Sequence, residues 1–156
     1  MSPCPQRIIL QKRLEATFAR ISALSELDPE LQADYARYLC ILVSGYFETA
    51  MHEIAISHCR ERSSPTVVSY ADSRLRKFQN VNSEKLLQFL SAFEGGWYEP
   101  AFAFLEGEHK DALNSVIALR NKIAHGEWVG LTYNTVKDYY RRIASIVEYV
   151  EALFDA

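Results

Sequence analysis

Residues 108–126 read EHKDALNSVIALRNKIAHG and place apolar side chains at the spacing of a helix that packs against other helices. At about 100° per residue these side chains form one stripe, which predicts a helix from about Glu108 to Ala124. The members of the stripe are Leu113, Val116, Ile117, Leu119, Ile123 and Ala124. Gly126 is expected to cap the end of this helix, because glycine readily takes the left-handed conformation used there.

Arg120 falls close to the middle of this apolar stripe, three residues after Ile117 and four before Ala124. A guanidinium that faces a core is costly unless it is paired or lines a polar cavity. A buried carboxylate partner is therefore expected. Glu48 and Glu53 are the candidates, and a helical wheel places Glu53 nearer the apolar stripe of their own helix.

Asn114, Asn121 and His125 share a polar edge of the helix, because separations of seven and four residues return to nearly the same face. His125 lies in the last turn, where the helix dipole favours a protonated imidazole. An imidazole that changes charge near neutral pH suits acid–base catalysis on a phosphodiester, and an adjacent guanidinium suits the phosphate. Attack by a ribose 2′-hydroxyl on that phosphate needs no metal. Lys122 and Asn114 are the candidate substrate-binding residues.

The same residues also fit a purely structural interpretation. Arg120 would then only pair with a buried carboxylate, and His125 would only cap the C-terminus of a helix. The combination of a central arginine, an adjacent asparagine and a terminal histidine followed by glycine favours the functional interpretation.

The rest of the chain is also patterned as helices, without alternating strands or repeats, which predicts one all-α domain over residues 1–156. The expected arrangement is an antiparallel helical bundle with a shorter helical insertion. Asp28, Ser83 and Thr132 are the expected N-caps of three of the helices. The expected helices span residues 6–27, 29–62, 65–78, 84–93, 108–124 and 133–154. Residues 97–107 are expected to be irregular or one short helix broken by Pro100.

Composition bounds the possible partners of the chain. Its 156 residues carry a net charge of −3, so any binding site for a polyanion has to be a local cationic patch. No apolar run approaches the roughly 18 residues of a membrane span, and no signal peptide is apparent, which predicts a soluble, cytoplasmic protein without a membrane partner. Cys4, Cys40 and Cys59 form no CxxC pair, and the last two are expected as buried thiols.

Three clusters of basic residues are candidates for tracking RNA phosphates, with a solvated charged face as the alternative. The clusters are Arg60 with Arg62, Arg74 with Arg76 and Lys77, and Arg141 with Arg142. His52 and His58 are not four residues apart and lack an evident third ligand, so no metal site is expected.

Arg120–Asn121 followed by His125–Gly126 resembles the R-x4-H signature of the HEPN superfamily, whose common form is RN-x3-H-G near the end of a helix. Ser44–Gly45–Tyr46–Phe47–Glu48 also resembles the small-residue, aromatic and glutamate stretch of that family. The resemblance covers about residues 31–154 and looks closest to the branch called RiboL-PSP HEPN.

The resemblance implies an all-α bundle that dimerises and so brings two copies of the motif into one cleft. It implies a metal-independent endoribonuclease that needs no cofactor and is often a toxin or antiviral effector, with an antitoxin or another regulatory protein as a further partner. Arg120 and His125 would be the catalytic pair, oriented by Asn121. The resemblance also favours Glu48 over Glu53 as the partner of Arg120.

One subgroup of the family has a tyrosine two residues after the histidine, as a target of adenylylation. This chain has Glu127 there, which argues against silencing by that route. Some relatives keep the signature without known nuclease activity. The alternative function is therefore a non-catalytic HEPN module that dimerises or binds nucleotide or RNA.

Overall fold

The computed structural model describes residues 3–24, 26 and 28–156, and the described residues form helices without a strand. This confirms the all-α prediction. The helices are α1 Pro5–Ser22, α2 Pro29–Arg62, α3 Pro65–Leu75, α4 Ser83–Phe93, the short 3-10 helix η1 Gly95–Trp97, α5 Tyr98–Leu105, α6 Glu108–Ala124 and α7 Tyr133–Asp155.

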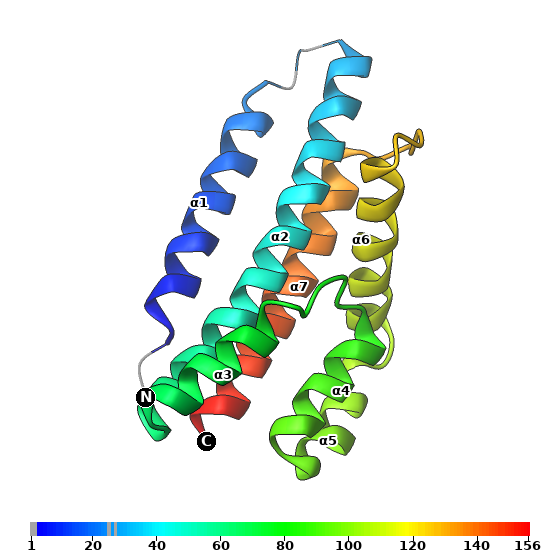
Figure 1. Ribbon diagram of the computed structural model, residues 1–156. Helices are drawn as coiled ribbons and strands as arrows, with labels where there is room; N and C mark the ends of the chain where they lie inside the picture. Colours follow the sequence, from blue (N-terminus) through cyan, green and yellow to red (C-terminus); the bar gives the residue numbers. More distant parts are fainter. Residues whose placement is uncertain (1–2, 25, 27) are drawn as a thin grey trace.

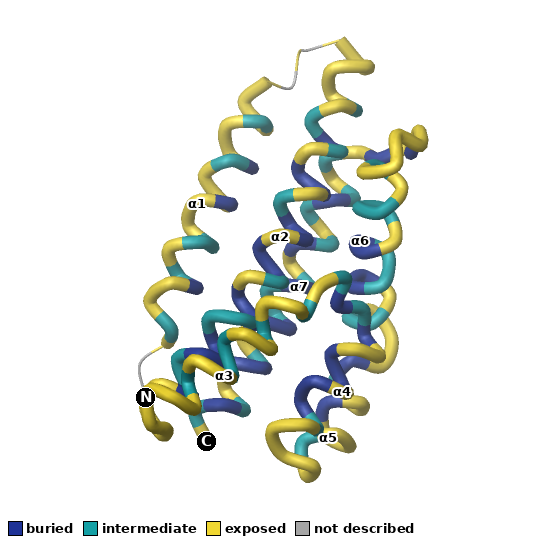
Figure 2. Tube along the Cα trace, viewed as in Figure 1, coloured by how far each residue is buried: buried dark blue, intermediate teal, exposed yellow. Residues whose placement is uncertain are grey.

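The four long helices α1, α2, α6 and α7 alternate in direction and form the bundle, while α3, α4 and α5 are shorter and gather towards one end (Figure 1). Figure 2 shows buried residues along much of α2 and α7 and on the inward faces of α1 and α6. The predicted antiparallel bundle with a shorter helical insertion is therefore confirmed. Both chain termini lie at the end of the bundle opposite the C-terminal end of α6 (Figure 1).

Local capping explains where several helices begin. The Asp28 carboxylate accepts a hydrogen bond from the Glu30 amide at 2.8 Å, and the Thr132 hydroxyl accepts one from the Thr135 amide at 3.2 Å, as expected. The N-cap of α4 is Asn82 and not Ser83, because the Asn82 side chain accepts the hydrogen bond from the Lys85 amide at 3.0 Å.

Other boundaries differ from the expectation. The first and third helices end early, at Ser22 and Leu75, and the expected end of the first helix at Leu27 lies outside the described residues. Pro100 does not break α5, because it lies in the first turn of that helix, where its missing N–H would have no helical partner.

The helix α2 is the centre of the core and packs against α1, α3, α6 and α7. This helix is long enough and, with a mean hydropathy of 1.3, apolar enough to cross a membrane, whereas the sequence predicted no such segment. However, 61% of that apolar window is buried inside the bundle, as in the core helix of a packed protein. Cys40 and Cys59 are buried on this helix, which confirms that prediction.

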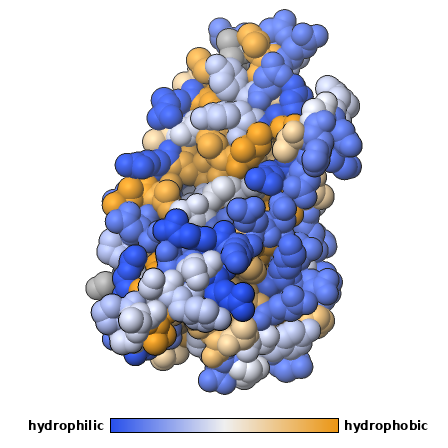
Figure 3. All heavy atoms as spheres, in the orientation of Figure 1, coloured by the Kyte–Doolittle hydropathy of each residue, from blue (hydrophilic) through white to orange (hydrophobic). Residues whose placement is uncertain are grey.

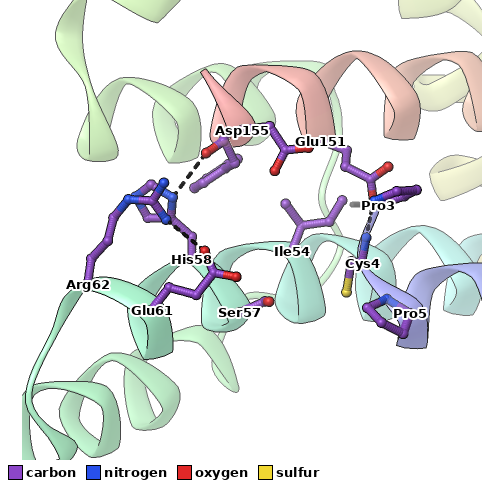
Figure 4. A pocket seen from close by; sticks show the side chains of 11 residues that line it. Pro3, Cys4, Pro5, Ile54, Ser57, His58, Glu61, Arg62, Glu151 and Asp155 are labelled. Carbon is purple, nitrogen blue, oxygen red and sulfur yellow. Dashed lines mark hydrogen bonds and ion pairs between the residues drawn. The ribbon is translucent and has the colours of Figure 1, made fainter. Parts of the chain in front are cut away.

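A buried ion pair holds α1 against α7. The Arg7 guanidinium donates to the Glu151 carboxylate at 2.5 and 3.1 Å. The Cys4 amide donates to the same carboxylate at 2.9 Å, as Figure 4 shows. The hydrogen bond that Arg7 donates to Glu151 raises the pKa of Arg7 above its ordinary value, so the guanidinium stays charged. The N-terminal helix is thus fixed to the bundle at the end where the chain termini lie.

Candidate functional site

The C-terminal end of α6 closes with a Schellman arrangement. The Glu127 amide donates to the Lys122 carbonyl at 2.9 Å, and the Gly126 amide donates to the Ile123 carbonyl at 3.0 Å. Gly126 has φ +77° at the left-handed position, so the C-cap residue itself is His125, one position earlier than expected. Since the cap is built from backbone bonds, the imidazole of His125 is not needed to end the helix.

His125 and Lys122 are both exposed at this end of α6. Within the described residues, neither side chain has a hydrogen-bond or ion-pair partner in the structure. The loop that follows is held at Val129, whose side chain is buried. The Val129 carbonyl also accepts a hydrogen bond from Arg37 of α2 at 3.4 Å. The histidine is therefore accessible on a helix end whose backbone is held in place.

Arg120 is half-buried rather than central to the core. The buried residues of α6 are Ala112, Leu113, Val116 and Ile117, all of which precede it. Its Nη1 donates to the Asn80 side-chain oxygen at 3.1 Å and to the Asn121 side-chain oxygen at 3.4 Å. The arginine is thus oriented by two neutral amides, and Asn121 contacts the arginine rather than the imidazole.

The expected direct pair between Arg120 and Glu48 is not formed. Among the described residues, Arg120 makes no ion pair with a carboxylate, and the Glu48 Oε1 instead accepts a hydrogen bond from the Asn80 backbone amide at 2.7 Å. Asn80 therefore stands between the two and binds both. Glu53 is not the partner either, since its carboxylate lies 3.6 Å from the His52 ring.

Asn80 is the residue that sequence reasoning missed. It lies in the loop between α3 and α4 and has φ +54°, a left-handed conformation that asparagine tolerates better than most residues. This loop contains no glycine, so its asparagines were the residues most able to make such a turn. The presence of asparagines in this loop did not predict which residues of α2 and α6 Asn80 would bind.

If the chain cleaves RNA through Arg120, as the resemblance implies, replacing Asn80 with glycine should lower kcat by roughly 10- to 100-fold, because the displaced guanidinium would no longer meet the phosphate correctly. Glycine keeps the left-handed backbone, so only the side-chain contact is lost. The measurement is steady-state cleavage together with a thermal melt. Gln79→Ala is the matched control in the same loop, and an Asn80→Gly protein that keeps the wild-type kcat would contradict this role.

The expectation that Asn114 binds substrate is not supported by its surroundings. The Asn114 Oδ1 accepts a hydrogen bond from the Ser83 backbone amide at 2.9 Å, in the first turn of α4. This bond satisfies one of the free amides of a helix N-terminus. Asn114 therefore joins α4 to α6, and the polar edge predicted for α6 divides into a structural part and an exposed part at His125.

Gly126→Ala is expected to lower the free energy of unfolding by about 1–2 kcal/mol, because an alanine is strained at its positive φ. Gly45→Ala is the matched control. Gly45 lies inside α2 with open space where a Cβ would be, so alanine there should raise stability by about 0.5–1 kcal/mol. Chemical denaturation measures the free energy of unfolding of both variants, which should fall for Gly126→Ala and rise for Gly45→Ala. Equal changes in the two variants would contradict the left-handed cap.

A separate pocket of about 320 Å³ lies at the opposite end of the bundle, near the chain termini (Figure 4). Several of its polar side chains already have partners: His58 contacts the Phe154 carbonyl at 3.2 Å, Arg62 pairs with Glu61, and Glu151 pairs with Arg7. Within the described residues, no three His, Cys, Asp or Glu side chains are grouped so as to hold a metal ion. The accessible histidine and arginine of α6 are the better candidate for chemistry.

The model of the family described as RiboL-PSP-HEPN matches residues 11–156, a range that includes the whole of α2, α6 and α7. No curated protein and no solved structure matches the chain.

Proposed function

Since the chain belongs to the RiboL-PSP-HEPN family, we propose that it is a metal-independent endoribonuclease. The observation that carries this proposal is the exposed His125 at the end of α6, five residues after an arginine that Asn80 and Asn121 orient. An accessible imidazole moves protons, and an oriented guanidinium stabilises charge on a phosphate. When the 2′-hydroxyl of a ribose attacks the neighbouring phosphate, the reaction needs both a group that moves protons and a group that stabilises charge.

In the proposed reaction the ribose 2′-oxygen bonds to the phosphorus and the bond from phosphorus to the 5′-oxygen breaks. His125 takes the proton of the 2′-hydroxyl or delivers a proton to the leaving oxygen. Arg120 holds the phosphate and offsets the charge that builds on its free oxygens. Lys122, exposed in the last turn of α6, supplies a further positive charge for the RNA backbone.

The proposal includes a homodimer. One motif offers one imidazole, whereas the reaction is better served by one group that accepts a proton and another that donates one. Two-fold symmetry provides the second copy. Trp128, which follows the motif, is 81% exposed, as expected for an aromatic residue that closes a protein contact. Trp97 and Tyr98 offer less surface for such a contact, because Trp97 packs on Phe154 and Tyr98 is only 39% exposed.

Cleavage is expected to persist in EDTA and to leave 2′,3′-cyclic phosphate ends, because the histidine and the arginine supply the proton transfer and the charge without a metal. The measurement is cleavage of a labelled RNA in the presence of EDTA, with the product ends identified by mass. Activity that disappears in EDTA and returns with magnesium would contradict the mechanism. A stable dimer that leaves RNA uncut would favour the non-catalytic HEPN module instead.

We further propose that this activity serves as a toxin or antiviral effector in the cytoplasm, restrained by an antitoxin or another regulatory protein. The support is the family together with an accessible site that has no inhibitory segment over His125 in the part of the chain that the structure describes. Expression of the wild-type chain should then arrest growth, and expression of the His125→Ala chain should not.

A further inference from the structure

We propose that Tyr70, Arg74 and Lys77 form a track that binds single-stranded RNA and leads it to Arg120. This inference rests on the proposed function for the reaction at the end of the track, whereas binding by the track can be measured without cleavage. We call these three residues the α3 track. They lie on the outer face of α3 and in the turn after it.

Local charge supports an anionic ligand on this segment. Residues 65–82 contain three cations, Arg74, Arg76 and Lys77, and one acidic residue, Asp72, so the segment carries +2 in a chain of net charge −3. Both carboxylate oxygens of Asp72 are occupied, one by His52 and one by Arg76, each at 2.8 Å. These bonds hold the pKa of Asp72 below its ordinary value. The positive charge that remains available is that of Arg74 and Lys77.

This cluster differs from the other two basic clusters of the sequence in how many of its cations form ion pairs. Arg62 pairs with Glu61, Arg141 with Asp138, and Arg142 with Glu108. In these two clusters, only Arg60 makes no ion pair among the described residues. Arg74 and Lys77 make no ion pair with any carboxylate among the described residues. A phosphate that binds them therefore displaces no carboxylate. This cluster offers two cations without a carboxylate partner, whereas each of the other two clusters offers one or none, which favours it as the RNA contact.

Tyr70 adds a stacking surface beside the cations. Its side chain is 63% exposed, and the Arg74 guanidinium lies over its ring at 5.7 Å from the centroid. Single-stranded nucleic acid is bound by such combinations, in which a base stacks on an aromatic ring and a cation meets the adjacent phosphate. An acidic peptide would use the cations but would gain nothing from the ring, so the tyrosine favours RNA.

The helix α3 is placed to serve this purpose. None of its described residues is buried, so its outer face is not required by the core. It is anchored to α2 by the bond between His52 and Asp72, and the loop after it is anchored by Glu48. That loop crosses the front of the bundle to α4 (Figure 1), and its Asn80 holds Arg120. The α3 track thus continues directly into the candidate active site.

The surface on this side of the molecule agrees with this path. Figure 3 shows an apolar band across α1 and α2, and mostly hydrophilic atoms below it over α3 and the loop towards α4. The apolar band suits a protein contact, while the hydrophilic region suits a solvated polyanion. The α3 track therefore lies in the hydrophilic region and outside the apolar band.

The test measures the affinity for a fluorescent single-stranded RNA by anisotropy, using the full chain with His125→Ala so that the RNA stays intact. Glutamine replaces Arg74 and Lys77 together, since glutamine has a similar helix propensity and preserves α3. This double variant should bind roughly tenfold more weakly, and its salt dependence should fall by about 1.4 in log–log slope, about 0.7 for each lost phosphate contact. Arg141→Gln, at an exposed and paired arginine on α7, is the matched control.

Tyr70→Ala should weaken binding by roughly 5- to 150-fold, and Tyr70→Phe should retain it, because the ring and not its hydroxyl stacks on the base. Wild-type affinity and salt slope in the double variant, while the His125-intact chain cuts RNA, would overturn the track and leave the nuclease proposal standing. RNA bound through α3 but never cut would support the track and overturn the nuclease. Equal binding of a poly-glutamate peptide, insensitive to Tyr70→Ala, would overturn the assignment to RNA.

Discussion

His125→Ala is expected to reduce RNA cleavage by about 10²- to 10⁴-fold, which is the contribution of a well-placed general acid or base. The fold should be unaffected. The imidazole is exposed, the helix end is capped by backbone bonds of Gly126 and Glu127, and no described side chain bonds to the ring. The measurement is the single-turnover rate of cleavage of a labelled RNA, with a thermal melt of the same preparation.

Glu127→Ala is the matched control, because it is also exposed and lies two residues further along the same turn. It should leave both the rate and the melting temperature unchanged. The enzyme proposal fails if the His125→Ala protein cuts RNA as fast as the wild type.

Arg120→Ala is expected to lower the cleavage rate by about 10²- to 10³-fold, because it removes the group that stabilises charge on the phosphate. The effect on folding should be small. A buried ion pair would cost about 3–5 kcal/mol when one partner is removed. Arg120 is half-buried and bonds to two neutral amides, so a loss of about 0.5–1.5 kcal/mol is expected instead. Cleavage rates and denaturant melts of this variant measure the two effects.

The contact with Asn80 provides the control for this second prediction. If Asn80 acts only through Arg120, then Asn80→Gly should add no further loss of rate in the Arg120→Ala protein. Fully additive losses of rate would contradict that role. A loss of stability near 5 kcal/mol in Arg120→Ala would show that the arginine is buried in solution as the apolar stripe suggested.

The two catalytic variants also test the proposed dimer. When Arg120→Ala and His125→Ala protomers are mixed, a shared cleft holds one intact arginine and one intact histidine in each heterodimer. Partial recovery of cleavage is therefore expected, relative to either variant alone. A chain that sediments as a monomer and still cuts RNA at full rate would contradict the dimer.

The sequence alone determined most helix positions, because those depend on residues close together in the chain. The proline and aspartate at residues 28–29 begin α2, and the threonine at residue 132 begins α7, through hydrogen bonds that span only two or three residues. Gly126 ends α6 for the same reason. The signature at residues 120–126 and the stretch at residues 44–48 are local patterns as well, and together they suggested the family that the match over residues 11–156 shows.

The tertiary structure decided how Arg120 is held. The helical wheel placed this arginine towards the core but contained no information on the loop that would meet it. That loop brings Asn80 against Glu48, 32 residues away in sequence, and against Arg120, 40 residues away. It also places the Ser83 backbone amide against the side-chain oxygen of Asn114, so that Asn114 joins two helices instead of facing the candidate site. A side-chain pattern along one helix reports the direction in which each residue points, but the contact it makes depends on the path of every segment packed beside it.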